Sequence, residues 1–289
     1  MFREKHSKQL MAAVQNGRAP RVKSLLKKDV NVNHIDRQGR TSLIYAAEEG
    51  MVGITGSLIR AGADVNIVSN SLESALMLAA KRGSAPVMEL LLKAGAKPNA
   101  NDRNGNTALM FASVWATRMA STGISDTGQK LALLLEAGAD TNIQDAKGRT
   151  ALMASIRSGG GALDEEYRLP LLRMLIEAGA DINLQAEKGK TALMSAAFRG
   201  LKESFKLLLE AGADYNIKDE AGRSPLIYAS RGCFWSYRRS GYISIVQQLL
   251  KKGVDLTPMD NQGRTALITA KRYGPEEIVT LLTKAGAKQ

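Results

Sequence analysis

The sequence is poor in the residue types on which most catalytic and metal-binding sites depend. Its 289 residues include one cysteine, Cys233, and two histidines, His6 and His34. A single cysteine excludes an internal disulfide bond. Metal sites need clusters of histidine, cysteine or carboxylate ligands, and no Ser/His/Asp or Cys/His arrangement is recognisable. We therefore expect a non-enzymatic protein with no catalytic, metal or cofactor-binding residues and no cofactor.

Long apolar runs are missing as well. No segment approaches the about 20 apolar residues that are needed to cross a bilayer. Residues 1–10 are charged and lack the apolar core of a signal peptide. This favours a cytoplasmic protein by default, with the bacterial periplasm as the alternative if an export signal has been removed.

Aromatic residues are scarce, at 5% of the chain, whereas alanine, leucine and glycine are abundant and recur at regular intervals. Helix-opening threonines or serines are separated by 33 residues in three intervals and by 41 or 43 in the other three; they are Thr41, Ser74, Thr107, Thr150, Thr191, Ser224 and Thr265. Such a period indicates a stacked array, because one short unit cannot bury its apolar face alone.

One stretch, Ala186–Lys218, shows the logic of the unit. Thr191 can cap a helix over 192–199, because its hydroxyl can accept from an unpaired N–H of the first turn. Gly200 ends that helix. A second helix follows over 201–211, with apolar side chains at helical spacing, and a glycine then closes it.

The recurring pattern Asp-x-x-Gly-x-Thr-x-Leu, a pair of small residues, Leu-Leu and Gly-Ala-Asp-x-Asn resembles the ankyrin repeat. The resemblance covers nearly the whole chain. It implies an all-α solenoid of helix-turn-helix units with β-hairpin turns, about eight repeats long. The family's usual Thr-Pro-Leu-His is replaced by Thr-Ala-Leu-Met at 107–110, 150–153 and 191–194, which resembles bacterial ankyrin proteins.

The period divides the chain, taken as a single domain over 1–289, into eight units. The N-terminal cap has predicted helices over 7–16 and 20–28. In the third unit Ser69 replaces the turn aspartate and Leu72 the turn glycine, so we expect a distorted or shifted hairpin there. The unit boundaries are 1–35, 36–68, 69–101, 102–144, 145–185, 186–218, 219–259 and 260–289.

Units four, five and seven contain insertions of 10, 8 and 8 residues between their paired helices. The extra residues lie near Val114–Lys130, Gly159–Leu169 and Arg231–Tyr242. In unit four the pattern predicts a first helix lengthened over 108–120 and a loop over 121–128. Insertions at one equivalent corner commonly line one face of a solenoid, often a binding face.

The chain carries a formal net charge of +12 and has a pI near 9.8. An evenly basic, solvated exterior is one explanation, and a face for an acidic partner is the other. The resemblance places two sets of basic residues on the partner-facing side. Those just before the helix-opening residue are Arg40, Arg149, Lys190, Arg223 and Arg264; those near the ends of the first helices are Lys81, Arg82, Arg157, Arg199, Arg231 and Arg272.

The insertions interleave aromatic and arginine residues, the types enriched at binding hot spots. These candidate binding residues are Trp115, Arg118, Tyr167, Arg168, Phe234, Trp235, Tyr237, Arg238 and Arg239, with Tyr242 beside them. Alternatively, the rings pin the insertions onto neighbouring helices. Likewise, the recurring Met77, Met110, Met153 and Met194 form either a contact stripe or, as helical spacing favours, the core between repeats.

Taken together, these features predict a protein-protein interaction module that binds a specific folded, acidic protein. Stoichiometric inhibition of an enzyme such as a bacterial hydrolase, or protection against it, is one concrete form. The alternative is binding of a polyanion, such as nucleic acid or an acidic cell-surface polymer, with steep salt dependence. We expect the chain to be monomeric alone.

Overall fold

The computed structural model describes residues 2–115, 124–157, 164–232 and 238–288. Over these ranges it contains sixteen α-helices and one 3₁₀ turn, while β-structure is limited to isolated bridges. The predicted all-α class is confirmed. The chain forms two compact units, residues 1–146 and 147–289, called unit 1 and unit 2 below.

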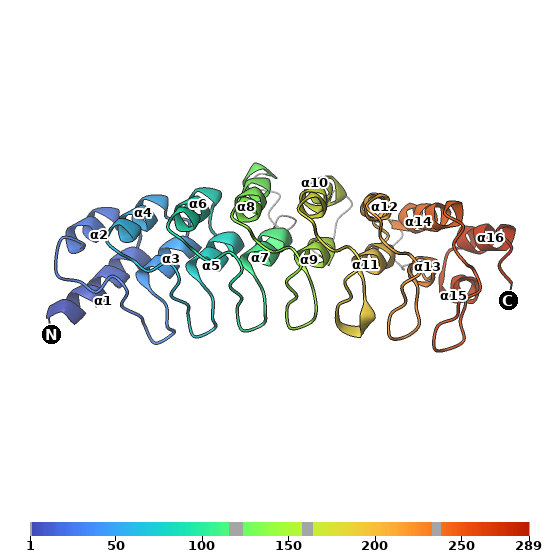
Figure 1. Cartoon of the computed structure of the whole chain (residues 1–289), viewed down its shortest axis with the longest axis horizontal. Helices are drawn as coiled ribbons and strands as arrows, with labels where there is room; N and C mark the ends of the chain where they lie inside the picture. The colour runs from blue at the N-terminus through green and yellow to red at the C-terminus, as the bar shows by residue number, and fades with distance from the viewer. Residues whose placement is uncertain (1, 116–123, 158–163, 233–237, 289) are drawn as a thin grey trace. The chain divides into compact units, whose positions relative to one another are not determined.

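Unit 1 contains four successive helix pairs (Figure 1). The first helices of the pairs pack side by side in one layer, and the second helices in another. The predicted helices of the N-terminal cap differ from the observed ones, since α1 begins earlier and α2 ends earlier. The bounds are α1 Phe2–Gln15, α2 Ala19–Leu25, α3 Ser42–Glu48, α4 Val52–Arg60, α5 Ala75–Lys81, α6 Ala85–Lys93, α7 Ala108–Trp115 and α8 Ile124–Glu136.

Unit 2 repeats this arrangement with four further pairs (Figure 1). Its first helices α9, α11, α13 and α15 pack in sequence, and so do its second helices α10, α12, α14 and α16. The boundaries of the eight predicted repeats stay a prediction, since the structure gives helices and hairpins rather than repeat limits. The bounds are α9 Ala151–Arg157, α10 Asp164–Glu177, η1 Glu187–Gly189, α11 Ala192–Arg199, α12 Lys202–Glu210, α13 Pro225–Ser230, α14 Arg239–Lys251, α15 Ala266–Tyr273 and α16 Glu276–Lys284.

The helix-opening threonines and serines act as predicted. Each accepts a hydrogen bond from the backbone N–H three residues later, as Thr191 does from Met194 at 3.2 Å. The remaining caps are Thr41, Ser74, Thr107, Thr150, Ser224 and Thr265. Gly200 ends α11 with φ +66°, in the left-handed region that glycine adopts without strain.

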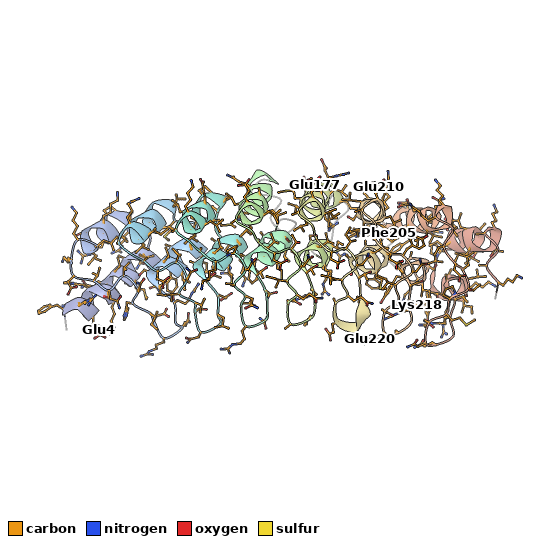
Figure 2. All side chains as sticks on the ribbon, in the orientation of Figure 1. Glu4, Glu177, Phe205, Glu210, Lys218 and Glu220 are labelled. Carbon is orange, nitrogen blue, oxygen red and sulfur yellow. The ribbon has the colours of Figure 1, made fainter. Side chains whose placement is uncertain are left out.

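The core of each unit lies between its two helix layers. Phe205 on α12 has no exposed surface and lies between the layers of unit 2 (Figure 2). The recurring Met77, Met110, Met153 and Met194 are also buried. They therefore belong to the core between repeats, as their helical spacing favoured.

The hairpins are linked to one another by backbone hydrogen bonds. The amide of Asn70 donates to the carbonyl of Gln38 at 2.9 Å, and that of Arg103 to Ser71 at 3.1 Å. In unit 2 the amide of Glu187 donates to Lys147 at 2.8 Å, and that of Glu220 to Lys188 at 3.0 Å. These bonds hold each hairpin against the next, so the row of hairpins is a prearranged surface within each unit.

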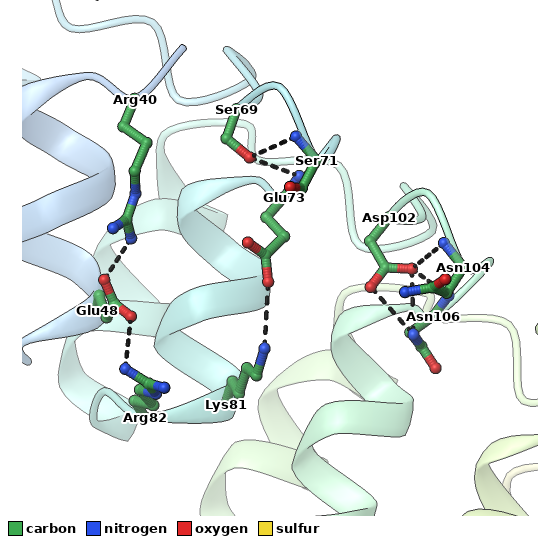
Figure 3. Close-up of polar contacts among 10 residues, drawn as sticks. All are labelled: Arg40, Glu48, Ser69, Ser71, Glu73, Lys81, Arg82, Asp102, Asn104 and Asn106. Atoms are coloured by element: carbon green, nitrogen blue, oxygen red, sulfur yellow. Dashed lines mark hydrogen bonds and ion pairs between the residues drawn. The ribbon is translucent and has the colours of Figure 1, made fainter. Parts of the chain in front are cut away.

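The hairpin of the third repeat, around residues 69–73, is not distorted, contrary to the sequence-based expectation (Figure 3). The Ser69 hydroxyl accepts from the amides of Ser71 and Glu73, both at 3.2 Å, and so replaces the turn aspartate. In the fourth hairpin Asp102 does the same for Asn104 and Asn106, both at 2.8 Å. Leu72 adopts φ +61° and thus takes the conformation of the missing glycine.

The insertions lengthen the second helices. The second helices α8, α10 and α14 have 13, 14 and 13 residues, whereas α4 and α12 have 9 each. The loop predicted over 121–128 is therefore wrong from residue 124 onward, because α8 begins there. The predicted extension of the first helix over 116–120 lies outside the described residues. Across the described ranges, none of the helices combines the length and apolar character needed to span a membrane.

Candidate protein-interaction face

Several basic side chains of unit 1 are engaged within the protein. Glu48 forms ion pairs with Arg40 and, at 3.0 Å, with Arg82 (Figure 3). Arg40 also stacks over the Tyr45 ring, 4.4 Å from its centroid. Because Arg40 and Glu48 expose only 17% and 12% of their side chains, little of this charge is offered to a partner.

The next repeat has the same contact with the charges reversed. Lys81 pairs with Glu73 at 3.2 Å (Figure 3). It also lies over the Phe111 ring, 5.0 Å from its centroid. In both repeats the residue before the helix-opening position pairs with the residue eight positions later. The pairing joins the hairpin to the end of its own first helix, so it braces the repeat.

Unit 2 has no opposite charges at these two positions. The corresponding pairs are Arg149 and Arg157, Lys190 and Phe198, Arg223 and Arg231, and Arg264 and Arg272. An arginine pair cannot form the ion pair that Arg40 and Glu48 form. The ends of the first helices of unit 2 are thus basic or aromatic, and Arg157, Phe198, Arg231 and Arg272 are all exposed.

Two of the unit 2 arginines are held by their own hairpins instead. Arg223 pairs with Asp219 at 2.7 Å, and Arg264 with Asp260 at 2.6 Å. Burial opposes the ionisation of Asp219, but hydrogen bonds from Tyr228 and Arg223 outweigh it and hold the pKa of that carboxyl below its usual range. Burial and the Asp219 carboxylate together raise the pKa of the Tyr228 hydroxyl. These ion pairs and hydrogen bonds brace the turns of the two hairpins.

A basic trough runs between the hairpins and the first helices of unit 2. It consists of two adjoining pockets of about 220 and 170 Å³ that share Arg157, Lys190 and Ser195. Arg157 and Lys190 are exposed, and within the part of the chain that the structure describes neither makes an ion pair. Phe198 lies at one end of the trough and is 50% exposed. Its ring packs edge-to-face against that of Tyr228, with the ring centroids 5.9 Å apart.

Arg168 was predicted to bind a partner, and the structure contradicts this. Arg168 is completely buried, and its Nε donates to the carbonyl of Ser155 at 3.1 Å. The same insertion supplies Glu165, whose carboxylate accepts from the amide of Ser204 at 2.9 Å at the start of α12. This insertion therefore supports neighbouring helices, while Tyr167 beside it is half-buried.

The third insertion likewise packs on the preceding repeat. Arg238 donates to the carbonyl of Arg199 at 2.9 Å, and the Tyr242 hydroxyl donates to that of Phe198 at 2.9 Å. Arg239 is exposed and pairs with Glu277 at 2.5 Å. For Tyr242 the alternative that rings pin the insertion is confirmed. The other candidates lie outside the described residues: the side chain of Trp115, Arg118, Phe234, Trp235 and Tyr237. Cys233 lies outside them too.

Sequence reasoning missed the residues that complete the trough. Phe198, Tyr228, Lys147 and Lys188 line it but were not candidates. A signal was present for Phe198, because it occupies the position that carries charge in the other unit 2 repeats. Among the described residues, no three or more His, Cys, Asp or Glu side chains gather in a way that could hold a metal ion.

Paired helices in two layers, linked hairpins and a preformed groove beside them define a repeat protein built to bind other macromolecules. Sequence profiles described as ankyrin repeats (3 copies) match residues 4–69, 119–219, 161–238 and 219–289. A profile described as ankyrin repeats (many copies) matches residues 58–112. The chain belongs to the ankyrin-repeat family. No curated protein matches it. Ankyrin repeats indicate a protein-protein interaction module, and proteins built from them are generally non-enzymatic scaffolds.

Proposed function

We propose that this protein binds a folded protein partner with an acidic surface, through the hairpins and first helices of unit 2. The observation that carries the proposal is the basic trough beside the half-exposed Phe198. Six basic side chains line its two pockets, against one acidic side chain, Glu187. Such a field steers an acidic partner toward the face and selects against basic ones.

The linked hairpins support the same conclusion. Binding costs free energy when side chains and loops have to be ordered, and a surface already held in place avoids much of that cost. In unit 2 each hairpin is held to its neighbour by a backbone hydrogen bond, such as that from Glu187 to Lys147 at 2.8 Å. Phe198 then supplies an apolar contact of the kind that anchors protein interfaces.

One concrete form of this function is stoichiometric inhibition, in which the face covers the active site of an enzyme, such as a bacterial hydrolase. The test is to add the chain in increasing molar ratio to a captured partner that has enzymatic activity. Inhibition that is complete at one equivalent supports this form. Unchanged activity at saturation contradicts it while leaving the binding function intact.

The alternative function is binding of a polyanion, and the net charge of +12 favours it. The exposed aromatic edge at Phe198 argues for a protein, since a duplex or an acidic polymer is bound mainly through its charges. Salt separates the two. Affinity for a polyanion falls steeply and linearly with the logarithm of salt concentration, whereas a protein interface keeps its apolar share.

A matched pair of charge reversals tests the proposed function. Proteins from the source cells are captured on the immobilised chain and identified by mass spectrometry. We expect Arg157→Glu with Lys190→Glu to weaken binding of the main captured protein at least about tenfold, since exposed attractions of up to about 1 kcal/mol each become repulsions.

The control is Lys202→Glu with Lys206→Glu on α12, which changes the charge equally in the other helix layer, where both lysines are exposed. This variant should bind as the unchanged protein does. Equal loss in both variants, or capture that disappears after nuclease treatment, would contradict the proposal.

A further inference from the structure

The trough of unit 2 differs in chemistry along its length. One end is lined by Lys147, Arg149 and Lys188, which come from two successive hairpins. The other end is lined by Met194, Phe198 and Tyr228, which come from α11 and α13, together with Arg199 at the end of α11. A ligand that fills the trough therefore contacts positive charge at one end and apolar side chains at the other.

The shared middle of the trough is suited to a polypeptide backbone. Arg157, Lys190 and Ser195 line both pockets. The Ser195 hydroxyl donates to the carbonyl of Thr191 at 3.1 Å, which leaves its oxygen as an acceptor. An N–H of a peptide can donate to this oxygen, whereas the sugar-phosphate backbone of a DNA strand has no donor to offer.

Glu187 and Asp219 do not neutralise Arg157 or Lys190. Glu187 lines the hairpin end and is exposed. Asp219 is buried, accepts a hydrogen bond from the Tyr228 hydroxyl, and is already neutralised by Arg223 at 2.7 Å. Within the described chain Arg157 and Lys190 make no ion pair, so carboxylates of a ligand can balance these two charges.

The apolar end of the trough adds a second requirement, because it favours a ligand with an apolar side chain as well as negative charge. Phe198 keeps 50% of its surface exposed, although its ring centroid lies 5.9 Å from that of Tyr228. Met194, one turn earlier in α11, is 1% exposed. One aliphatic or aromatic side chain placed there would cover Phe198 and gain its burial free energy. The Tyr242 hydroxyl bond to the Phe198 carbonyl, 2.9 Å long, holds this position in place.

We propose that the trough binds an extended acidic segment of the partner, with carboxylates along the hairpins and one apolar side chain against Phe198. This rests on the proposed function and deepens it, because it assigns the recognition to a short linear segment rather than to a broad folded surface. An acidic segment is the ligand whose charge complements the basic side chains that line the trough.

The test uses the full chain and fluorescein-labelled peptides, read by fluorescence anisotropy. The first peptide has two pairs of glutamates on either side of one leucine. The second has serine in place of the leucine, and the third has lysine in place of every glutamate. We expect the first to bind, the second to bind about tenfold more weakly, and the third not to bind.

Variants locate the site. Phe198→Ser should remove the preference for leucine over serine, while Arg157→Glu with Lys190→Glu should abolish binding of both acidic peptides. Lys202→Glu with Lys206→Glu should leave both unchanged. Circular dichroism and thermal unfolding show that each variant is folded, which is expected because these side chains are largely exposed.

The outcomes separate this inference from the proposed function. If the first two peptides bind equally, or neither binds, while a captured protein still depends on Arg157 and Lys190, the inference is overturned and the proposed function stands. If neither a peptide nor a captured protein depends on these residues, both are overturned. A single-stranded oligonucleotide that binds more tightly than the first peptide at physiological salt also overturns the inference, in favour of a polyanion.

Discussion

The hydroxyl of Tyr242 donates to the backbone carbonyl of Phe198 at 2.9 Å, 44 residues away in the sequence. Tyr242 lies near the start of α14, where an insertion lengthens that helix, and its residue is 2% exposed. The bond therefore joins an insertion to the end of α11 in the preceding repeat. It shows how residues outside the 33-residue period support the candidate binding face.

Tyr242→Phe should lower the free energy of unfolding by about 1 kcal/mol, because it removes one buried hydrogen bond and keeps the ring. Tyr242→Ala should cost about 3–5 kcal/mol, since the buried ring is lost as well. Urea unfolding followed by circular dichroism measures both. Tyr215→Phe is the control, because the Tyr215 hydroxyl lies 3.4 Å from the Lys252 carbonyl in a more exposed setting. A cost for Tyr215→Phe as large as that for Tyr242→Phe would contradict this account.

Leu72→Gly should leave stability unchanged or raise it by up to about 1 kcal/mol. Leu72 has φ +61°, and a left-handed conformation costs a residue with a side chain about 1–2 kcal/mol. The greater freedom of glycine in the unfolded chain offsets part of this gain. The denaturant midpoint measures the difference.

The reverse change at the equivalent glycine, Gly39→Leu, should cost more than about 2 kcal/mol. A Cβ atom at Gly39 would lie 2.8 Å from the backbone nitrogen of Asn70 in the next hairpin, and φ there is +73°. If Leu72→Gly destabilised the protein by as much as Gly39→Leu, strain at Leu72 would be refuted.

The stability of the protein should fall in acid partly through Asp219. Its folded-state pKa lies below the ordinary value, because hydrogen bonds from Tyr228 and Arg223 outweigh burial. A depressed folded pKa gives stability that is present above the unfolded pKa of about 3.9 and is lost as pH falls through the folded pKa. Unfolding midpoints measured from about pH 6 down to about pH 2 should therefore drop, most steeply below about pH 4.

Asp219→Asn should remove part of that drop and lower stability near neutral pH by about 2 kcal/mol, as expected for hydrogen bonds to a charged group. Asp36 and Asp260 have depressed pKa values through the equivalent hairpin contacts, so the acid dependence becomes shallower but does not vanish. An unchanged slope in the Asp219→Asn variant would show that this carboxylate is not responsible.

Glu48→Gln should destabilise unit 1 by about 1–2 kcal/mol. Its carboxylate, in a side chain only 12% exposed, serves both Arg40 and Arg82, so the change leaves a largely buried arginine without its partner. Glu203→Gln is the matched control, since Glu203 is 46% exposed and 3.7 Å from Lys202, and exposed pairs contribute little. Thermal unfolding of both variants is the measurement; equal shifts would contradict the role given to Glu48.

The helices and caps were predictable because they depend on neighbours in the chain. Thr191 caps α11 through an N–H three residues away, and Gly200 ends it with a positive φ. The hairpin at Ser69 was mispredicted because the rule used there required an aspartate and a glycine. The serine hydroxyl accepts the same two amides, and Leu72 adopts the conformation of the glycine.

The candidate site was only partly predictable, because the fate of a charge depends on residues that the fold brings near it. Arg40, Arg149 and Arg168 were all candidate binding residues in the sequence. In the structure Arg40 pairs with Glu48, Arg149 lines the trough and Arg168 is completely buried. Lys147 and Phe198 line different pockets, and they belong to one site because the fold makes the two pockets adjoin.

By itself, therefore, the sequence determined the repeating helix pairs, their caps and the basic character of the chain, since each depends on composition or on residues a few positions apart. Only the tertiary structure decided which basic residues are neutralised, which are buried and which line the trough of unit 2. The physical reason is that pairing and burial depend on contacts across successive repeats and hairpins, and the spacing of residues in one repeat does not specify those contacts.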